Sequence, residues 1–241
     1  MISPMDTFSI RSRVRSKYFN NPNYVSLKIK DAIVDQIRNK YGKRPSIDRD
    51  DSTYPLFIYI ENYTLKIFLN TSGKPLFMRG YKGKIHKTSL NEALAAGMIL
   101  MTGWERSQPF YDPMCGSGTF PIEATLIGQN IPPGIFRKQF SFQKWRNYDA
   151  DLWNKIVENA KNKIMTDNLH IAGSDFIEKN VNLAIKNAKR INVNQFISFS
   201  ILDISQFSPT MENGIIMINP PYGYRIGEIE DLQKLYKVIG D

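Results

Sequence analysis

The chain has 241 residues, 42% of them hydrophobic and 12% aromatic, so it can bury a core and wholesale disorder is excluded. No apolar run reaches the roughly 18 residues needed to cross a bilayer, and no N-terminal signal pattern is present. The single cysteine, Cys115, excludes an internal disulfide, and only two histidines accompany it, so no metal site is expected. These features predict a soluble, cytoplasmic protein of one large or two small domains, without membrane contact.

Basic side chains are concentrated in the first half of the chain. Lys and Arg number 32 against 23 Asp and Glu, a formal net charge of +9. Residues 1–111 carry 18 basic and 9 acidic side chains, whereas residues 112–241 carry 14 of each. This asymmetry indicates that the first half binds a polyanion and the second acts on something smaller. A basic surface that only serves solubility is the alternative.

The first 75 residues predict a small α+β unit. Residues 10–18 alternate basic with small or apolar side chains, which favours a strand with one cationic face. Apolar residues at helical spacing predict an amphipathic helix over 26–40, ended by Gly42 and Pro45. The runs 56–60 and 65–69 predict a hairpin.

Strands and helices alternate in the rest of the chain. A helix is expected from Thr88 and Ser89 to Gly103, with Ser89 and Glu92 at capping-box spacing. The expected strands are 109–111, 170–172, 196–201 and 214–218, and the expected helices are 119–129, 150–165, 177–190 and 230–238. This order predicts an α/β fold with a parallel sheet covered by helices on both faces.

A glycine-rich turn, Asp112-Pro-Met-Cys-Gly-Ser-Gly-Thr119, follows the first of these strands. Gly116 and Gly118 let the backbone approach a ligand at the carboxyl end of the strand, where open α/β sheets bind their ligands. The turn has neither the third glycine of a dinucleotide fingerprint nor the Gly-Lys-Ser/Thr of a phosphate loop. It therefore suits a ligand without a pyrophosphate, and a tight turn without a ligand is the alternative.

Three carboxylates follow three successive strands. Asp112 would meet a cationic group, Asp175 is placed to accept ribose hydroxyls, and Asp203 could bond an adenine amino group. Each of them alone could equally be solvated or cap a helix. Because parallel strands end at one edge of a sheet, the series predicts a shared binding edge.

The string Ile218-Asn-Pro-Pro-Tyr-Gly223 follows the fourth expected strand. Its two prolines stiffen the chain and remove two N–H donors. The Asn219 side-chain oxygen and the Pro220 carbonyl then form a pair of acceptors beside the Tyr222 ring. Two acceptors and a ring fit a planar exocyclic amine, although the string by itself could be only a rigid turn.

Together these motifs resemble those of S-adenosylmethionine-dependent, Rossmann-like methyltransferases that modify an exocyclic amine. The chain is most similar to the branch of RNA guanine-N2 methyltransferases with an RNA-binding THUMP domain. The similarity covers about residues 25–241 and includes Arg79-Gly-Tyr81, Glu92–Ala96, the insertion at 133–145, and Leu235-Tyr236.

The resemblance implies an α/β fold: a Rossmann-like class I methyltransferase sheet, about four strands of it seen, after a partial THUMP module. The implied domains are a THUMP-like region at 1–80, a linking helix region at 81–107 and the methyltransferase domain at 108–241. S-adenosylmethionine would contact Asp112, Pro113, Cys115, Gly116, Ser117, Gly118, Thr119, Asp175, Asp203 and Asn219. The target base would be held by Asn219, Pro220, Pro221 and Tyr222. RNA would contact Arg11, Arg13, Arg15, Lys17, Arg79, Lys82 and Lys84.

The implied reaction is methyl transfer to the exocyclic N2 amine of a guanine in RNA, with 23S ribosomal RNA favoured over transfer RNA by the 133–145 insertion. A DNA adenine-N6 methyltransferase would share the Asn-Pro-Pro-Tyr pocket, but the THUMP-like first half and the lack of a sequence-reading domain argue against it. A protein-glutamine methyltransferase would share the pocket but not the basic first half. The family's sheet has seven strands, so a catalytically inert RNA-binding fragment is a further alternative. We expect a second copy or a C-terminal segment to cover the open sheet edge.

Two further features have more than one interpretation. Cys115 in the glycine-rich turn is expected to be a packing residue, because no histidine is near it in sequence. The aromatic residues of the insertion, Phe136, Phe140, Phe142 and Trp145, lie beside Arg and Lys. They could stack on unpaired bases or fill a small core of their own.

Overall fold

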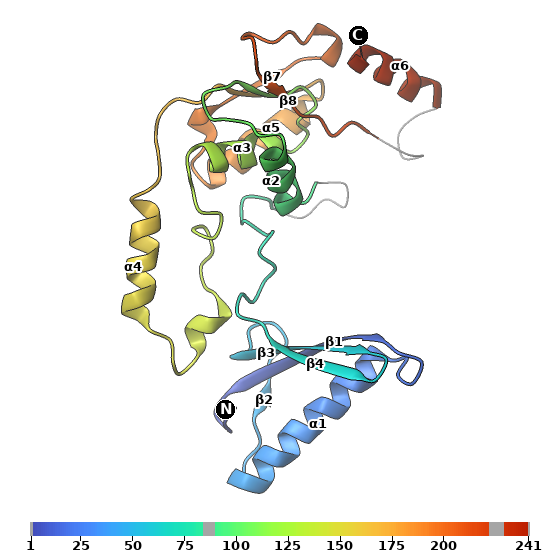
Figure 1. The fold of residues 1–241 in the computed structure, drawn as a ribbon, viewed down its shortest axis with the longest axis vertical. Coiled ribbons are helices and arrows are strands. Elements are labelled where there is room, and N and C mark those ends of the chain that lie inside the picture. Colours follow the sequence, from blue (N-terminus) through green and yellow to red (C-terminus); the bar gives the residue numbers. More distant parts are fainter. Residues whose placement is uncertain (1, 84–89, 222–228, 241) are drawn as a thin grey trace. The chain divides into compact units, whose positions relative to one another are not determined.

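A computed structural model describes residues 2–83, 90–221 and 229–240 (Figure 1). The chain forms two compact units. Unit 1 contains Met1–Pro75 and Lys138–Trp153, and unit 2 contains Leu76–Arg137 and Asn154–Asp241. No helix in the described ranges is long and apolar enough to cross a membrane.

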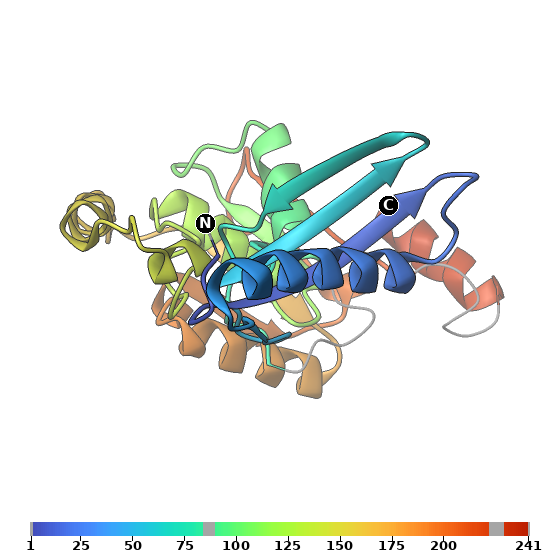
Figure 2. The ribbon, with the colours of Figure 1, turned by 90° about the horizontal axis from the view of Figure 1, so that it is seen from below.

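Unit 1 is built on a four-stranded sheet with the order β2-β1-β3-β4. The strands are β1 (Thr7–Arg15), β2 (Ser46–Ile47), β3 (Tyr54–Glu61) and β4 (Thr64–Leu69). Strand β1 runs parallel to β2 and β3, and β3 pairs antiparallel with β4 as the predicted hairpin. Helix α1 (Pro22–Tyr41) runs along one face of this sheet (Figure 2).

The ends of α1 have clear local causes. The Asn21 side chain accepts a hydrogen bond from the Tyr24 amide, and Pro22 occupies the first turn, where its missing N–H costs nothing. Gly42 adopts φ +68° after the last turn, a left-handed conformation that glycine takes without strain. Val25 and Val34 of α1 are buried against the sheet. The predicted start at residue 26 was therefore one helical turn too late.

Residues 138–145 of the aromatic insertion pack within unit 1, whereas Phe136 packs against the core of unit 2. The Trp145 ring stacks on Tyr54 with 6.4 Å between centroids, and its indole N–H donates to the Thr53 carbonyl over 3.0 Å. Phe140 and Phe142 lie edge-on to Trp153, with 5.5 and 5.0 Å between ring centroids. Of the two interpretations of these three rings, the structure supports the filling of a small core.

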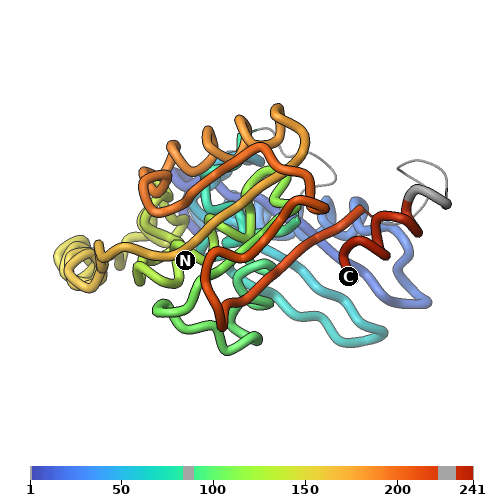
Figure 3. The backbone as a smooth tube through the Cα atoms, turned by 90° about the horizontal axis from the view of Figure 1, so that it is seen from above, coloured from blue at the N-terminus to red at the C-terminus, as the bar shows by residue number. Residues whose placement is uncertain are grey.

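Unit 2 contains a second four-stranded sheet, with the order β7-β6-β5-β8 and all pairs parallel. Its strands are β5 (Phe110–Asp112), β6 (Ile171–Asp175), β7 (Ile197–Ile201) and β8 (Ile215–Ile216). Its helices are α2 (Glu92–Met101), α3 (Thr119–Gly128), α5 (Glu178–Arg190) and α6 (Ile229–Gly240), while α4 (Ala150–Lys161) spans the boundary of the two units. The chain can be followed from green to red in Figure 3. The predicted α/β fold with a parallel sheet is confirmed.

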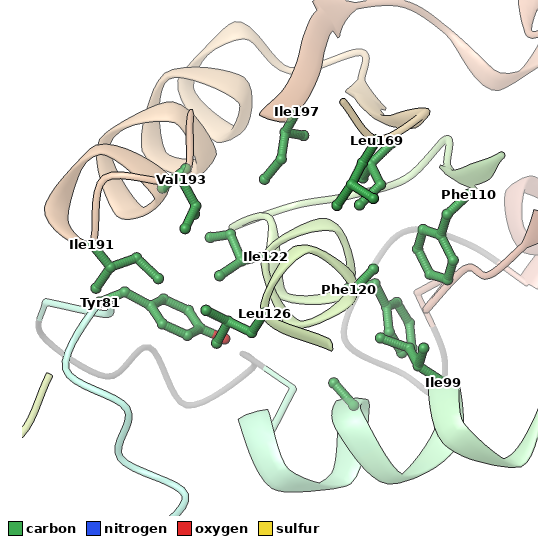
Figure 4. Packing of buried hydrophobic residues seen from close by; sticks show 14 of the residues in the cluster. Tyr81, Ile99, Phe110, Phe120, Ile122, Leu126, Leu169, Ile191, Val193 and Ile197 are labelled. Atoms are coloured by element: carbon green, nitrogen blue, oxygen red, sulfur yellow. The ribbon is translucent and has the colours of Figure 1, made fainter. Parts of the chain in front are cut away.

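Helix α3 is the centre of the unit 2 core. Phe120, Ile122 and Leu126 of this helix are almost fully buried, and side chains from α2, β5, β6 and β7 surround them (Figure 4). Each such side chain contributes about 1.5–3 kcal/mol by leaving water. Because α3 begins directly after the glycine-rich turn, this packing fixes where the turn lies.

The start of α2 differs from its prediction. The helix begins at Glu92, and the Asn91 side chain accepts from the Leu94 amide over 3.1 Å, so Asn91 is the N-cap. The predicted cap, Ser89, lies outside the described residues. Asn and Ser are about equally good caps, so spacing alone chose the wrong one.

Candidate functional site

The predicted binding residues lie at one edge of the unit 2 sheet. All four strands are parallel, so the residues that follow them gather at their carboxyl ends. The strand order places Asp203, Asp175, Asp112 and Asn219 in that sequence along the edge. The strand order reverses between β5 and β8, and this reversal is where open α/β sheets bind ligands.

The two glycines of the turn have different roles. Gly116 has φ +52° and nothing within 4 Å of an added Cβ, so the space beside it is open. Gly118 has φ +79°, and its Cβ would lie 2.9 Å from the Ala184 Cβ of α5. The sequence predicted ligand approach at both positions; at Gly118 the close neighbour is helix α5.

Asp175 connects the glycine-rich turn to α5. Its Oδ2 accepts from the Gly116 amide over 3.0 Å, and its Oδ1 accepts from the Ile177 amide and from the Asn180 side chain. The side chain is buried, at 7% exposure. A carboxylate has about four acceptor positions, so one remains on Oδ2 for a ligand hydroxyl.

Asp112 is the most deeply buried acid of the edge. It is 2% exposed, and its Oδ1 accepts from the Met114 amide over 3.2 Å. Burial raises the pKa of Asp112 well above its ordinary value, and the negative charge of Asp175 raises it further. A buried carboxylate without a cationic partner is costly, so this site favours a positively charged ligand group.

Cys115 is a packing residue in this arrangement. Cys115 is 6% exposed, and a Cβ added to Gly173 would lie 3.2 Å from the Cys115 Cβ. Burial, with the charges of Asp112 and Asp175, raises the pKa of the thiol, so the nucleophilic thiolate is disfavoured. In the described ranges no group of three His, Cys, Asp or Glu side chains could hold a metal ion.

Asp203 lies exposed after β7 and caps the short 3-10 helix Ile204–Gln206. Its Oδ1 accepts from the Ser205 amide over 2.9 Å and from the Ser205 hydroxyl over 2.6 Å, and these bonds lower its pKa. Its Oδ2 has no hydrogen-bond donor among the described residues. The capping role leaves that oxygen free for a ligand amine.

The Asn-Pro-Pro-Tyr string follows β8 as predicted from its position. Asn219 is exposed, whereas Pro220 and Pro221 are half-buried. The Tyr236 hydroxyl of α6 donates to the Pro221 carbonyl over 3.3 Å, which ties this turn to the last helix. Tyr222 lies outside the described residues.

A buried polar chain behind the turn was not predicted. The Asn187 side chain of α5 donates to the Ser117 carbonyl over 3.0 Å, and Arg190 donates both to Asn187 Oδ1 and to the Tyr81 carbonyl. Asn187 is 1% exposed. The available signal was an asparagine on the apolar side of an amphipathic helix, three residues after Ala184 and next to Ala188.

Four of the cations that were predicted to contact RNA lie at the surface of unit 1. Arg11, Arg13 and Arg15 of β1 are exposed, as is Lys17 just beyond the strand. Lys84 lies outside the described residues.

Two of those cations, Arg79 and Lys82, were predicted to contact RNA, but the structure buries their side chains. Their side chains are only 12% and 8% exposed. Arg79 Nε lies 3.6 Å from Glu123 Oε1, and Lys82 Nζ lies 3.8 Å from Glu92 Oε2. A sequence shows a positive charge but not the buried acid that faces it, so both residues belong to the interior of unit 2.

The parallel sheet, the glycine-rich turn after β5, the acid that ends β6 and the Asn-Pro-Pro-Tyr string after β8 are the features of a Rossmann-like methyltransferase fold. The comparisons with known proteins agree. The chain belongs to the RMKL-like methyltransferase family. The family model described as "RMKL-like, methyltransferase domain" matches residues 79–241, and the model of the THUMP domain matches residues 1–70.

Curated relatives extend the similarity over the whole chain. The ribosomal RNA large subunit methyltransferases K/L of Shewanella baltica strain OS155 and Shewanella oneidensis are 38% and 36% identical to it over 244 residues. These alignments cover 99% of this chain but only 34% of each relative. The chain therefore spans about a third of the length of these relatives.

Solved structures show the same fold. The crystal structure of SMU.472 complexed with SAH matches all of this chain and 63% of that one, with a TM-score of 0.88 and 28% identity. A structure described as a predicted N6-adenine-specific DNA methylase from Listeria monocytogenes has a TM-score of 0.87 and 31% identity, over 98% of this chain and 62% of that one.

Proposed function

We propose that unit 2 binds S-adenosylmethionine at the carboxyl edge of its sheet and transfers the methyl group to the N2 amine of a guanine in RNA. The observation that carries the proposal is the placement of buried Asp112 beside the Asn219 turn, where the strand order reverses. The SAH in the SMU.472 structure supports the cofactor. The names of the Shewanella relatives support large-subunit ribosomal RNA over transfer RNA.

The residues of the edge fit such a cofactor. Asp112 is a buried acid without a cationic partner among the described residues, and it would accept the ligand's ammonium group. Gly116 leaves open space beside its Cα, and Asp175 keeps one acceptor position for a ribose hydroxyl. The exposed Oδ2 of Asp203 would accept the adenine amine.

S-adenosylmethionine, when bound, supplies an electrophilic methyl group on a positively charged sulfur. The Asn219 side-chain oxygen and the Pro220 carbonyl would accept the two hydrogens of the guanine amine. These bonds would turn the nitrogen lone pair, otherwise delocalised into the ring, toward the sheet edge. Tyr222 would stack on the base. Holding the reacting groups in this way can supply roughly 7–11 kcal/mol of the barrier.

The proposal needs no strong base, because the proton leaves a nitrogen that is already methylated and positively charged. It does need an accessible guanine. The N2 amine of a paired guanine is bonded to cytosine, so the target must be unpaired or flipped out. The cations of unit 1 would add phosphate contacts that hold the RNA without reading its sequence.

The domain division is part of this proposal. Residues 1–80 would form the RNA-binding region, 81–107 the linking helix region and 108–241 the methyltransferase domain, with 138–153 packed in unit 1. Strand β8 is the edge of the four-stranded sheet, and its Ile216 is 50% exposed. Further chain or a second copy would cover this edge.

A DNA adenine-N6 methyltransferase is the second candidate. It is favoured by the name of the Listeria structure and by the Asn219 turn, which would accept an adenine amine in the same way. The two candidates differ in the nucleic acid that accepts the methyl group.

The test compares the 241-residue chain with Asn219→Ala in two assays. Calorimetric titration measures S-adenosylmethionine binding, and transfer of a labelled methyl group to 23S ribosomal RNA and to single-stranded DNA measures turnover. We expect cofactor binding to be retained, weakened at most by the loss of the single predicted Asn219 contact. Turnover on RNA at saturating cofactor should fall by about 10²-fold, the usual effect of losing one positioned polar contact.

The matched control is Asn162→Ala, an exposed asparagine of the same unit, which should leave both readings unchanged. An Asp175→Ala variant should lose cofactor binding. Full turnover by Asn219→Ala would remove Asn219 from the mechanism. Methyl transfer to DNA but not RNA would establish the second candidate, and no cofactor binding by the folded chain would refute the proposal.

A further inference from the structure

The two faces of the unit 1 sheet differ in character over strands β1 and β3. On the face that α1 covers, Phe8, Tyr54, Ile58 and Ile60 are buried. Side chains alternate along a strand, so the residues between these point to the opposite face, which we call the outer face. Its main residues are Arg11, Arg13 and Arg15 of β1, Phe57 and Tyr59 of β3, and Lys66 and Phe68 of β4.

Strand register arranges the outer face in rows. Phe57 of β3 lies between Arg11 of β1 and Phe68 of β4. The two phenyl rings are 6.2 Å apart between centroids and tilted by 39°. Phe57 is 37% exposed and Phe68 48% exposed, so both rings are open to a partner.

The next row has one ring between two cations. Tyr59 lies between Arg13 of β1 and Lys66 of β4. In the row beyond it, Arg15 faces Glu61, the one acid on the three strands of this face, and the Tyr59 hydroxyl donates to Glu61 over 3.3 Å. The outer face thus has aromatic rings along its middle and cations on both sides.

The cations of the outer face make no ion pair with any acid that the structure describes. Within the described ranges, no ion pair involves Arg11, Arg13, Arg15 or Lys66. Elsewhere in unit 1, by contrast, Arg146 pairs with Asp6 over 3.2 Å. Unpaired cations around exposed rings are complementary to a ligand with both phosphates and flat bases.

We propose that the outer face binds a single-stranded segment of RNA, with bases stacked on Phe57, Tyr59 and Phe68 and phosphates near the flanking cations. This inference rests on the proposed function for the identity of RNA, and it assigns the strandedness and the mode of recognition. Phe57 and Tyr59 are two residues apart on one strand, roughly 6.6 Å, so each ring can hold its own base.

A single strand fits this face better than a duplex. Bases inside a duplex are stacked on each other and cannot lie on protein rings, whereas unpaired bases can be splayed onto them. Other four-stranded sheets bind RNA through exposed rings on adjacent strands in this manner. A duplex would use only the cations.

The test measures fluorescence anisotropy of a labelled eight-nucleotide RNA of mixed sequence with the full chain and its variants. Phe57→Leu and Phe68→Leu keep an apolar side chain but remove the ring. Each should weaken single-strand binding on the order of 5- to 100-fold, the range measured for lost base stacking. The salt dependence should not change. Arg13→Gln should instead lower the slope of log affinity against log salt by about 0.7.

Tyr24→Leu is the matched control. Tyr24 is a ring on α1 that is 54% exposed, with Lys28 Nζ 5.5 Å from its centroid, but it lies on the other side of the sheet. Its loss should leave the affinity for the single-stranded RNA unchanged. When the same RNA is annealed into a duplex, the two Phe variants should bind it as tightly as the unchanged chain does.

Unchanged single-strand affinity in both Phe variants would overturn the proposal. So would a change of sedimentation coefficient in these variants at constant RNA affinity, which would make the outer face a protein interface. Asn162→Ala, the exposed control of unit 2, should retain full oligonucleotide binding. Ring-dependent binding in a chain that transfers no methyl group would uphold this inference while refuting the proposed function.

Discussion

Glu123 gives a sharp test of how unit 2 is held together. This residue of α3 is 1% exposed, and its Oε1 accepts from the Tyr81 hydroxyl over 2.9 Å and lies 3.6 Å from Arg79 Nε. Both partners favour the ionised form, but burial outweighs them and raises the pKa of Glu123 from 4.5 to about 7. Between pH 4.5 and about pH 7, Glu123 is therefore protonated in the folded chain but ionised in the unfolded chain.

The sign of the stability change follows from this difference. The contribution of Glu123 is fully present below pH 4.5 and is lost as the pH rises through about 7. The loss amounts to about 3 kcal/mol of the free energy of unfolding. Glu123→Gln carries no titrating group, so its free energy of unfolding relative to the unchanged chain should rise by about 3 kcal/mol between pH 4.5 and pH 8.

Urea unfolding at several pH values measures this difference. Trp104 reports on unit 2 when Trp145 and Trp153 are replaced by Phe in both proteins being compared. Losing the Arg79 contact shifts the variant by a constant amount, so only the change with pH is diagnostic. Two parallel stability profiles across this range would refute the reasoning, because they would mean that Glu123 is ionised at pH 5 in the fold.

Two further predictions concern the cofactor edge. A cationic ligand group beside Asp112 should drive a proton from its raised-pKa carboxyl, so S-adenosylmethionine affinity should fall on acidification and the titration heat should depend on the buffer. Equal heats in buffers of different ionisation enthalpy would contradict this, and Asp112→Asn should abolish the dependence. Asn187→Leu should cost about 1–3 kcal/mol of stability and weaken cofactor binding, because the hydrogen bond from the Asn187 side chain to the Ser117 carbonyl is lost. Asn182→Leu, on the exposed side of α5, is the control, and a variant at Asn187 with normal melting temperature and affinity would remove its positioning role.

Much of the fold could be predicted because local pattern and packing agree. Helix α5 is amphipathic with Val181 and Ala184 on its buried side, and the prediction at 177–190 differs from the structure by one residue. The carboxyl edge followed from the parallel strands alone, since Asp112 and Asp175 end strands β5 and β6 and Asp203 comes two residues after β7. These features depend on near neighbours in the sequence.

The errors concern residues whose role is set by distant partners. Arg79 and Lys82 read as surface cations because Glu123 and Glu92, which face them, are not neighbours in the sequence. Strand β2 has two residues and no pattern, and it exists because β1 offers it a free edge. The insertion was left with two interpretations because the acceptor of the Trp145 N–H lies 92 residues away.

The packing of the insertion determines how the chain can be taken apart. Because unit 1 contains two separate stretches of sequence, the backbone passes between the units three times, at residues 75/76, 137/138 and 153/154. A protease that cuts one of these connections leaves two others intact, so the pieces would stay joined until denatured. A gene fragment that stops at Pro75 would lack Trp145 and expose the Tyr54 ring beneath it. Expression of unit 1 by itself therefore needs residues 138–153 supplied through a new linker rather than a shorter reading frame.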